Sequence, residues 1–261
     1  MVWLVIAGFL YLWLITPRIP PRALFALGGK RYAHRGLHDG NRTVMENSLE
    51  AFRRARAKGL GVELDVQLSR DGELMVFHDE HLERVCGVSG KLGEKTAREL
   101  SCLGVPSLEE ALKVLEDAPL IVEIKYYGDW RTLTDEAVKR MAAYPGPWCM
   151  ESFHPLVVRH LKKRHPQVIR GQLALGADIR RMGHPVRDWV QKHLLHLFFS
   201  RPDFVALELG AEKGNISWWV LKKLFHTPMA CWTVRGEKQE RAAREKNYDM
   251  IIFEESNAKE G

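Results

Sequence analysis

The sequence has few cysteines, and they form none of the local patterns found in zinc knuckles or small disulfide-rich domains. Its four cysteines, Cys86, Cys102, Cys149 and Cys231, are widely spaced, and no Cys-x-x-Cys pair is present. This spacing argues against a zinc knuckle and gives little support to a disulfide framework. We expect four reduced and mostly buried thiols.

The sequence also lacks the patterns of nucleic-acid-binding proteins. It contains no groove-reading helix motif, no basic tail and no aromatic RNA-binding signature. Its formal net charge of +6 instead suits an anionic partner such as a phosphate ester or an anionic lipid. We therefore expect no nucleic-acid partner.

Charge is absent from the first 15 residues, which are almost wholly apolar (MVWLVIAGFLYLWLI). The run has neither the basic start nor the small-residue cleavage site of a secretory signal, and Arg18 and Arg22 follow it. Aromatic residues among leucines favour a membrane anchor over a buried terminal helix. A helix of this length spans about 22–24 Å, which is short for a hydrocarbon core of about 30 Å. The basic flank places the following domain on the cytoplasmic side.

These features predict three parts. Residues 1–16 form a single-pass transmembrane helix that holds the protein at the cell membrane. Residues 17–30, which contain Pro20, Pro21 and a Gly-Gly pair, form a linker, and residues 31–261 form one globular domain.

Predicted strands and helices alternate along the globular domain. Without one short hairpin, strands begin near 31, 62, 119, 148, 168, 204, 229 and 250. Predicted helices include 185–199 and 217–225, and capping boxes begin two others at Asn47 with Glu50 and at Ser107 with Glu110. Eight units predict a TIM-type (β/α)8 barrel with a short insertion after strand 2. An open doubly wound sheet is the alternative, but no Gly-rich phosphate loop follows the first strand.

Two acids occur in the predicted second strand, whose other residues are mostly apolar. Glu63 and Asp65 are two apart, so both side chains project from the same face. An Asp-Gly turn at 71–72 favours a tight hairpin that returns His78 beside them. Carboxylates buried in this way require a cation, a basic side chain or water.

Further polar residues occur at the predicted ends of other strands, where sites of parallel barrels form. They are His34 and Arg35, Glu123 and Lys125, Glu151 and Ser152, and Trp232 and Thr233. Each residue alone is compatible with a structural role. Together they predict a site, because so many charges on one rim need a cation or an anionic ligand.

The residue types indicate phosphodiester cleavage. Glu63, Asp65 and Glu123 offer only hard oxygen donors, which suit Mg²⁺ or Ca²⁺. His34 and His78 can exchange protons across a bond being cleaved. Arg35 and Lys125 can hold a phosphate oxygen.

An ordered set of short motifs carries a resemblance to a known family. The motifs are AHRG at 33–36, EN at 46–47, AF at 51–52, ELDV at 63–66, DG at 71–72, HD at 78–79, EIK at 123–125, SF at 152–153 and WTV at 232–234. This set, spread over residues 32–253, closely resembles the glycerophosphodiester phosphodiesterase family.

The resemblance implies a TIM-type barrel that uses a divalent metal to hydrolyse glycerophosphodiesters to sn-glycerol 3-phosphate and an alcohol. It implies general acid/base catalysis by His34 and His78, metal binding by Glu63, Asp65 and Glu123, phosphate or substrate contacts from Arg35, Lys125 and Trp232, and supporting positions for Glu46 and Asn47. The sequence departs from the family pattern before Glu46 and at the end of the last strand. Met45 stands where proline is usual, and Glu254 and Glu255 stand near the usual Thr-Asp of the last strand.

Two alternative functions are also compatible with the sequence. The apolar N-terminus and the short insertion favour lysophospholipids as substrates of a lysophospholipase D-type reaction. A catalytically inactive, anchored barrel that binds lipid headgroups is the other alternative, although no histidine or metal carboxylate of the motif set is missing. The sequence does not assign the acid and the base role to one or the other histidine. Water and the substrate's 2-hydroxyl are both compatible nucleophiles, and the sequence specifies no oligomeric state.

Overall fold

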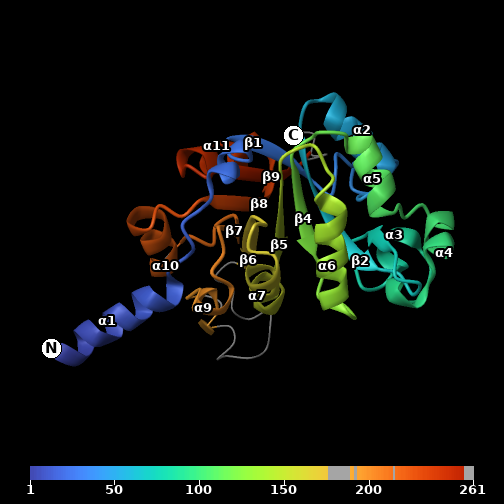
Figure 1. The fold of residues 1–261 in the computed structure, drawn as a ribbon. Helices are drawn as coiled ribbons and strands as arrows, with labels where there is room; N and C mark the ends of the chain where they lie inside the picture. The colour runs from blue at the N-terminus through green and yellow to red at the C-terminus, as the bar shows by residue number, and fades with distance from the viewer. Residues whose placement is uncertain (176–188, 191–192, 214, 256–261) are drawn as a thin grey trace.

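The computed structural model describes residues 1–175, 189–190, 193–213 and 215–255. Eight parallel strands with helices around them form a closed barrel (Figure 1). The strands are β1 (Lys30–His34), β2 (Gly61–Leu68), β4 (Leu120–Ile124), β5 (Trp148–Ser152), β6 (Arg170–Ala174), β7 (Phe204–Glu208), β8 (Met229–Arg235) and β9 (Met250–Glu254). Pairing of β1 with both β9 and β2 closes the barrel, and β3 (Leu74–Val76) pairs antiparallel to β2. The predicted barrel is confirmed, and each of its strands begins within two residues of the predicted position.

Helices connect the strands on the outside. They are α2 (Leu49–Ala57), α5 (Leu108–Leu115), α6 (Trp130–Met141), α7 (Pro155–Arg164), α9 (Leu197–Ser200), α10 (Ile216–Trp219) with a π-helical turn at Val220–Leu224, and α11 (Gly236–Glu245). The insertion between β3 and α5 contains α3 (Glu83–Cys86), a 3-10 turn at Leu92–Glu94 and α4 (Ala97–Cys102). Of the helix predicted at 185–199, residues 185–188 and 191–192 lie outside the described residues. Residues 193–196 form turns, and residues 197–199 belong to α9.

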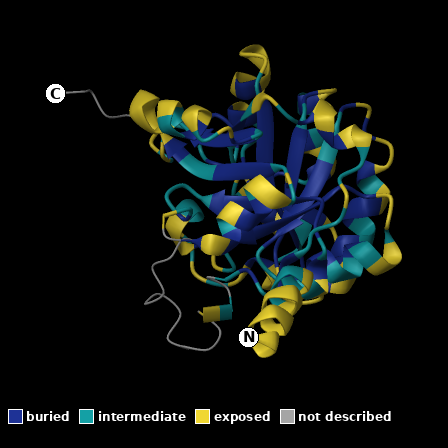
Figure 2. Ribbon diagram, turned by 90° about the vertical axis from the view of Figure 1, so that its left-hand side faces the viewer, coloured by how far each residue is buried: buried dark blue, intermediate teal, exposed yellow. Residues whose placement is uncertain are grey.

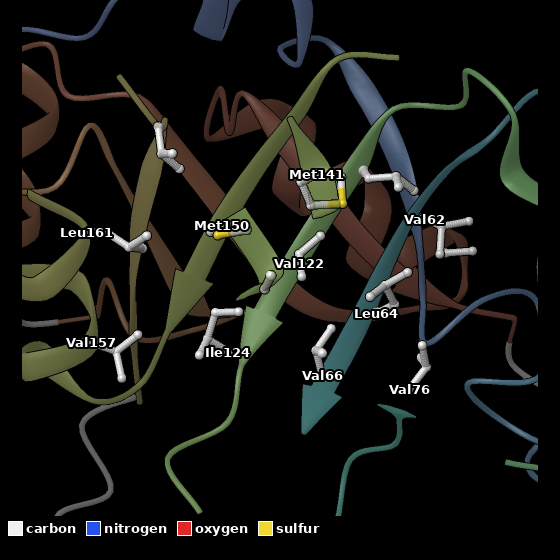
Figure 3. Close-up of a cluster of buried hydrophobic side chains, with 14 of the residues drawn as sticks. Val62, Leu64, Val66, Val76, Val122, Ile124, Met141, Met150, Val157 and Leu161 are labelled. Carbon is white, nitrogen blue, oxygen red and sulfur yellow. The ribbon is translucent and has the colours of Figure 1, made fainter. Parts of the chain in front are cut away.

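Alternation along the strands separates the outer core from the interior. Val62, Leu64 and Val66 of β2 point outward, into a cluster that includes Val122 and Ile124 of β4 (Figure 3). The residues between them point inward, because successive side chains of a strand face opposite sides. The acids of β2 therefore face the interior of the barrel.

The segment before β1 packs against the interior cluster of the barrel. A 3-10 turn at Arg22–Ala26 buries Leu24 and Leu27 in the same cluster as Tyr32 and Phe204. The hydroxyl of Tyr32 donates a hydrogen bond to the carbonyl of Leu27 at 2.8 Å. Part of the region predicted as a linker is therefore packed in the core.

One of the two predicted capping boxes differs in the structure. Ser107 and Glu110 begin α5 as predicted. The other helix begins one residue later, because Ser48, and not Asn47, accepts the hydrogen bond from the backbone N–H of Ala51. Asn47 adopts a positive φ of 54° and directs its amide toward Asp65. The capping prediction at Asn47 is wrong because this side chain serves the site.

The predicted N-terminal helix is present as α1 (Val2–Ile15). Its C-terminal end contacts the barrel domain: Ile15 is buried, and Tyr11 shares a hydrogen bond of 2.7 Å with Ser217. The rest of the helix is exposed and projects away (Figures 1 and 2).

Within the described part of the chain, the structure contains no helix with the length and apolar character needed to cross a membrane. This differs from the prediction of a transmembrane helix at 1–16. The 14 residues of α1 extend about 21 Å, whereas a hydrocarbon core is about 30 Å thick.

The barrel interior leaves no room for a side chain at Gly171. A Cβ atom built there would lie 2.2 Å from the ring of Phe204 on the neighbouring strand. We predict that Gly171→Ala lowers the free energy of unfolding by about 1–3 kcal/mol, as overpacking of a core does. Denaturant titration measures this. The control is Gly93→Ala, where the nearest atom would be 3.7 Å away; equal midpoints for both variants would contradict the packing argument.

Candidate active site

Inward-facing acids of three neighbouring strands form the base of the site. Glu63 and Asp65 project from β2, and parallel pairing sets Asp65 beside Glu123 of β4 and Glu123 beside Glu151 of β5. All four carboxylates are buried. Above them lies a cavity of about 780 Å³ at the C-terminal ends of the strands, where parallel barrels carry their sites.

Lys125 compensates two of these acids. Its Nζ lies 2.7 Å from Asp65 Oδ1 and 2.7 Å from Glu123 Oε1. Burial acts to raise the pKa of Asp65, but Lys125, His78 and Arg35 outweigh it and hold that pKa far below its ordinary value. Burial acts to lower the pKa of Lys125, but the two carboxylates raise it above its ordinary value. Asp65 is therefore ionised and Lys125 protonated.

The remaining acids have too little positive charge near them. Burial, together with the neighbouring carboxylates, raises the pKa of Glu63 and of Glu151 well above the ordinary range. Burial also raises the pKa of Glu123 to about 7 in spite of Lys125. Among the described residues, Oε2 of Glu151 has no hydrogen-bond partner. Ionising all four acids would therefore create negative charge that the cations of the cluster do not balance.

This unbalanced charge matches a site for a divalent cation. Ligating oxygens of Glu63, Asp65 and Glu123 lie within 4.8 Å of one another. All three residues offer hard carboxylate oxygens, which Mg²⁺ and Ca²⁺ prefer over softer nitrogen and sulfur donors. A divalent ion would also remove the cost of burying these carboxylates together. The residues present thus fit the predicted metal.

A second group of possible ligands lies away from the cavity, on α6 and at the end of α7. There Asp135 Oδ1 lies 2.7 Å from His160 Nε2 and 2.6 Å from His165 Nε2. None of the three lines the cavity. Their hydrogen bonds join the two helices.

His34 is held in place by the last strand. Its Nδ1 lies 2.7 Å from Glu254 Oε1, and its Nε2 lies 3.9 Å from Glu63 Oε2. A carboxylate at one ring nitrogen fixes the orientation of the ring and keeps the proton on that side. Burial lowers the pKa of His34, and Glu254 partly opposes this. Burial acts to raise the pKa of Glu254, but the hydrogen bond to His34 outweighs burial and lowers that pKa to about 2.

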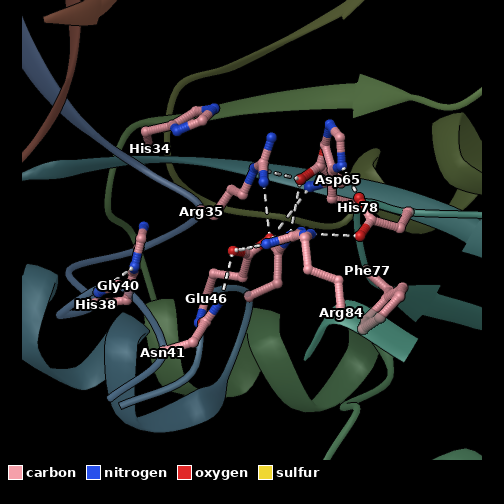
Figure 4. Close-up of polar contacts among 12 residues, drawn as sticks. His34, Arg35, His38, Gly40, Asn41, Glu46, Asp65, Phe77, His78 and Arg84 are labelled. Atoms are coloured by element: carbon pink, nitrogen blue, oxygen red, sulfur yellow. Dashed lines mark hydrogen bonds and ion pairs between the residues drawn. The ribbon is translucent and has the colours of Figure 1, made fainter. Parts of the chain in front are cut away.

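His78 is held in place by the insertion. Its Nδ1 lies 2.5 Å from Asp79 Oδ1, and Arg84 Nε donates to Asp79 Oδ2 at 2.6 Å. Arg84 also donates to both carboxylate oxygens of Glu46, at 2.6 and 2.8 Å (Figure 4). Burial lowers the pKa of His78. Arg84 thus connects the support of His78 to that of Arg35.

Arg35 connects the first strand to the acids. Its φ of 54° lets the backbone N–H donate to Glu63 Oε2 at 3.0 Å while Nη1 donates to Glu46 Oε1 at 2.7 Å (Figure 4). Its Nε lies 3.5 Å from Asp65 Oδ2. Asn47 Nδ2 donates to that same oxygen of Asp65 at 2.7 Å. Glu46 and Asn47 therefore support the site through Arg35 and Asp65.

An aromatic pair forms an apolar wall of the cavity. Trp232 of β8 and Phe153, which follows β5, meet edge to face with ring centroids 5.4 Å apart. Both rings line the cavity. They can contact the carbon atoms of a small substrate while the opposite side contacts its phosphate.

The structure brings together all ten residues that the sequence predicts for the site. They line the cavity or directly contact residues that line it: His34, Arg35, Glu46, Asn47, Glu63, Asp65, His78, Glu123, Lys125 and Trp232. Two residues that contact the site were not predicted from the sequence. Glu254 is signalled only by its place at the end of the last strand, and Arg84 lies in an insertion without a motif.

The fold and the site define a class: a (β/α)8-barrel enzyme with an acid-rich site at the C-terminal ends of its strands. A sequence model of the "Glycerophosphoryl diester phosphodiesterase family" matches residues 34–203. The chain therefore belongs to the glycerophosphoryl diester phosphodiesterase family and is a phosphodiesterase.

Individual relatives agree with this assignment. A glycerophosphodiester phosphodiesterase of Caldanaerobacter subterraneus is 29% identical over 85% of this chain and 93% of its own. The crystal structure of a glycerophosphodiester phosphodiesterase from Thermotoga maritima has a TM-score of 0.67 and 26% identity, covering 85% of this chain and 93% of its own. A phosphodiesterase of Oleispira antarctica, solved with the product sn-glycerol-3-phosphate, shares the fold, with a TM-score of 0.71, 19% identity and coverage of 88% and 94%.

The second prediction concerns the unbalanced acids. Mg²⁺ or Ca²⁺ at a hundred times its dissociation constant should stabilise the protein by about 2.7 kcal/mol, which raises Tm by about 5–10 °C. Glu63→Gln should abolish most of this increase, because it removes one predicted ligand. Thermal unfolding with and without the ion measures both effects. Glu255→Gln is the control because Glu255 is exposed and pairs with Lys58. An equal increase in Tm for all three proteins would exclude Glu63 as a ligand.

The third prediction concerns the positioning of His34. Glu254→Ala should lower kcat about 10–100-fold, the usual effect of removing a carboxylate that orients a functional histidine. Because Glu254 raises the pKa of His34, the variant should also shift the His34 limb of the pH–rate profile to lower pH. Glu255→Ala, the adjacent exposed acid, should change neither. An unshifted pH profile in Glu254→Ala would show that this contact is not functional.

Proposed function

We propose that the protein hydrolyses glycerophosphodiesters to sn-glycerol 3-phosphate and an alcohol. The observation that carries this proposal is one cavity in which His34 and His78 lie beside the acids Glu63 and Glu123. A phosphodiester bound there meets two proton-transfer groups and a predicted cation site together. The product bound to the Oleispira antarctica phosphodiesterase of the same fold supports the choice of substrate.

Different residues bind the metal and transfer protons in the proposed reaction. Glu63, Asp65 and Glu123 would hold the divalent ion, which when bound would polarise the phosphate. Burial keeps His34 and His78 largely neutral at pH 7, because it lowers both pKa values. One neutral imidazole takes a proton from the nucleophile, and the other, once protonated, gives a proton to the leaving alcohol.

The other groups bind and orient the substrate. Arg35 lies at the edge of the acids and can donate to a non-bridging phosphate oxygen. Lys125 is held between Asp65 and Glu123, so it acts on the phosphate mainly through its charge. Trp232 faces the cavity and can cover the glycerol carbons. Water and the glycerol 2-hydroxyl are both compatible nucleophiles in this arrangement.

We also propose that the protein works at a membrane, with the barrel on the cytoplasmic side. The exposed apolar surface of α1 and the basic residues Arg18 and Arg22 after it support this proposal, because the anionic cytoplasmic leaflet attracts basic residues beside a surface-bound apolar helix. An inactive headgroup-binding barrel is a weaker alternative, since all predicted catalytic and metal-binding side chains gather at one cavity.

The proton-transfer roles generate a fourth prediction. His78→Ala should lower kcat at least about 100-fold, while the stabilisation by Mg²⁺ or Ca²⁺ remains close to that of the wild type. Steady-state kinetics and thermal unfolding separate the two effects. His81→Ala is the matched control, because His81 is an exposed histidine of the same insertion. Turnover of His78→Ala near the wild-type rate would exclude its catalytic role.

The proposed reaction is tested by metal removal. EDTA should abolish hydrolysis of glycerophosphocholine, and added Mg²⁺ or Ca²⁺ should restore it. Phosphorus NMR identifies the product as sn-glycerol 3-phosphate or another phosphate ester. Full activity in the presence of EDTA would contradict the metal-dependent reaction.

A further inference from the structure

Two imidazoles and one carboxylate meet between α6 and α7, outside the catalytic cavity. The two helices lie side by side on the outer face of the barrel (Figure 1). Asp135 belongs to α6 and His160 to α7, and His165 directly follows α7. The Nε2 atoms of both histidines converge on Oδ1 of Asp135, and the three ligand atoms lie within 4.8 Å of one another. Three atoms able to bind a metal therefore meet at one point.

The carboxylate of this group is ionised and pairs with the two imidazoles. Partial burial acts to raise the pKa of Asp135, but the hydrogen bonds to His165 and His160 outweigh it and hold that pKa below its ordinary value. The cations one helical turn away on α6 have other partners in the described structure: Arg131 lies over an aromatic ring, and Lys139 pairs with a glutamate. A metal ion can therefore take the place of the imidazole protons without breaking an ion pair to lysine or arginine.

Packing and backbone hydrogen bonds hold the two histidines in place. The ring of His160 meets Trp130 edge to face, with ring centroids 5.7 Å apart and an angle of 87° between the planes. The backbone N–H of His165 donates to the carbonyl of Leu161 at 2.8 Å, and its own carbonyl accepts from the N–H of Val168 at 3.0 Å. Ligands that are fixed before the ion arrives lose little conformational freedom when they bind it.

The spacing and exposure of the three side chains suit a tetrahedral ion with one water ligand. Zinc bonds of about 2.0–2.1 Å to nitrogen and oxygen place neighbouring ligand atoms roughly 3.3 Å apart. The Nε2 atoms of His160 and His165 lie 2.7 and 2.6 Å from Asp135 Oδ1. Small side-chain rotations would therefore complete the geometry. The side chain of Asp135 is 42% exposed, so water can reach the fourth position.

The donor atoms distinguish this group from the acids of the catalytic cavity. Imidazole nitrogens suit Zn²⁺, Co²⁺, Ni²⁺ and Fe²⁺, whereas carboxylate oxygens suit Mg²⁺ and Ca²⁺. Two imidazoles with one carboxylate and a water is a donor set found in open zinc sites. Glu63, Asp65 and Glu123 offer carboxylates alone and belong to a separate group. The two groups should therefore prefer different ions.

We propose that Asp135, His160 and His165 form a second metal site, which binds one divalent transition-metal ion of the Zn²⁺ class with water as the fourth ligand. The ion fastens α6 to α7, the helices that follow β4 and β5, which carry Glu123 and Glu151. None of the three ligands lines the catalytic cavity, so the ion stabilises the fold and takes no part in the chemical step. The site is therefore independent of the proposed hydrolysis.

The site is tested by isothermal titration calorimetry and thermal unfolding with Zn²⁺, in the presence of excess Mg²⁺ to occupy the acids of the cavity. The wild type should bind one Zn²⁺ and gain about 5–10 °C in Tm at a hundred times the dissociation constant. His160→Ala and Asp135→Asn should each weaken Zn²⁺ binding at least about 100-fold. Removal of a group that only orients a ligand costs about 10–100-fold.

Two control variants separate this site from other groups that could bind zinc. His81→Ala removes an exposed histidine of the insertion, and Glu63→Gln alters the acids of the cavity. Both should bind Zn²⁺ with wild-type affinity. Loss of Zn²⁺ binding in Glu63→Gln, or wild-type affinity in His160→Ala and Asp135→Asn, would overturn the site.

A purely structural role of the same hydrogen bonds predicts a different result. Asp135→Asn keeps the shape of the side chain and its ability to accept hydrogen bonds, but it removes the charge that a metal needs. If the group only joins the helices, the difference in Tm between this variant and the wild type is the same with and without Zn²⁺. The proposed site requires that this difference widens by about 5–10 °C when Zn²⁺ is added. An unchanged difference would overturn the proposal.

Discussion

Four carboxylates buried at the mouth of one barrel are the constraint on which the rest of the site depends. Glu63, Asp65, Glu123 and Glu151 meet because parallel strands bring their C-terminal ends to one rim. Lys125 balances part of their negative charge. The raised pKa values of Glu63, Glu123 and Glu151 show that this cation is not enough for all four carboxylates. The same shortage of positive charge supports the divalent-cation site proposed above, at which a bound ion would polarise the phosphate.

Much of this arrangement could be predicted because it depends on periodicity. Two-residue spacing put Glu63 and Asp65 on one strand face, and the order of strands put Glu123 beside them. The features that could not be predicted depend on contacts between distant segments. The bond between Glu254 and His34 joins the last strand to the first, and Arg84 reaches Glu46 from an irregular insertion.

The polar centre and its apolar surroundings fit a substrate with both characters. His78 lines the catalytic cavity and also a neighbouring cavity of about 490 Å³ whose other lining residues include Tyr126, Tyr127 and His154, so the two environments meet at a residue proposed to transfer protons. Phe198 and Phe199 then extend the apolar surface to Trp13 of α1. A helix of 14 residues fixed in this way can lie at a lipid surface without crossing it.

The measurement that tests the central claim most directly is anomalous scattering from crystals soaked with Mn²⁺ or Ca²⁺. The account predicts one strong peak within about 2.0–2.6 Å of carboxylate oxygens of Glu63, Asp65 and Glu123. It also predicts that the peak disappears in Glu63→Gln. A structure with Lys125 still between Asp65 and Glu123, and no peak among the three acids at millimolar ion, would contradict it.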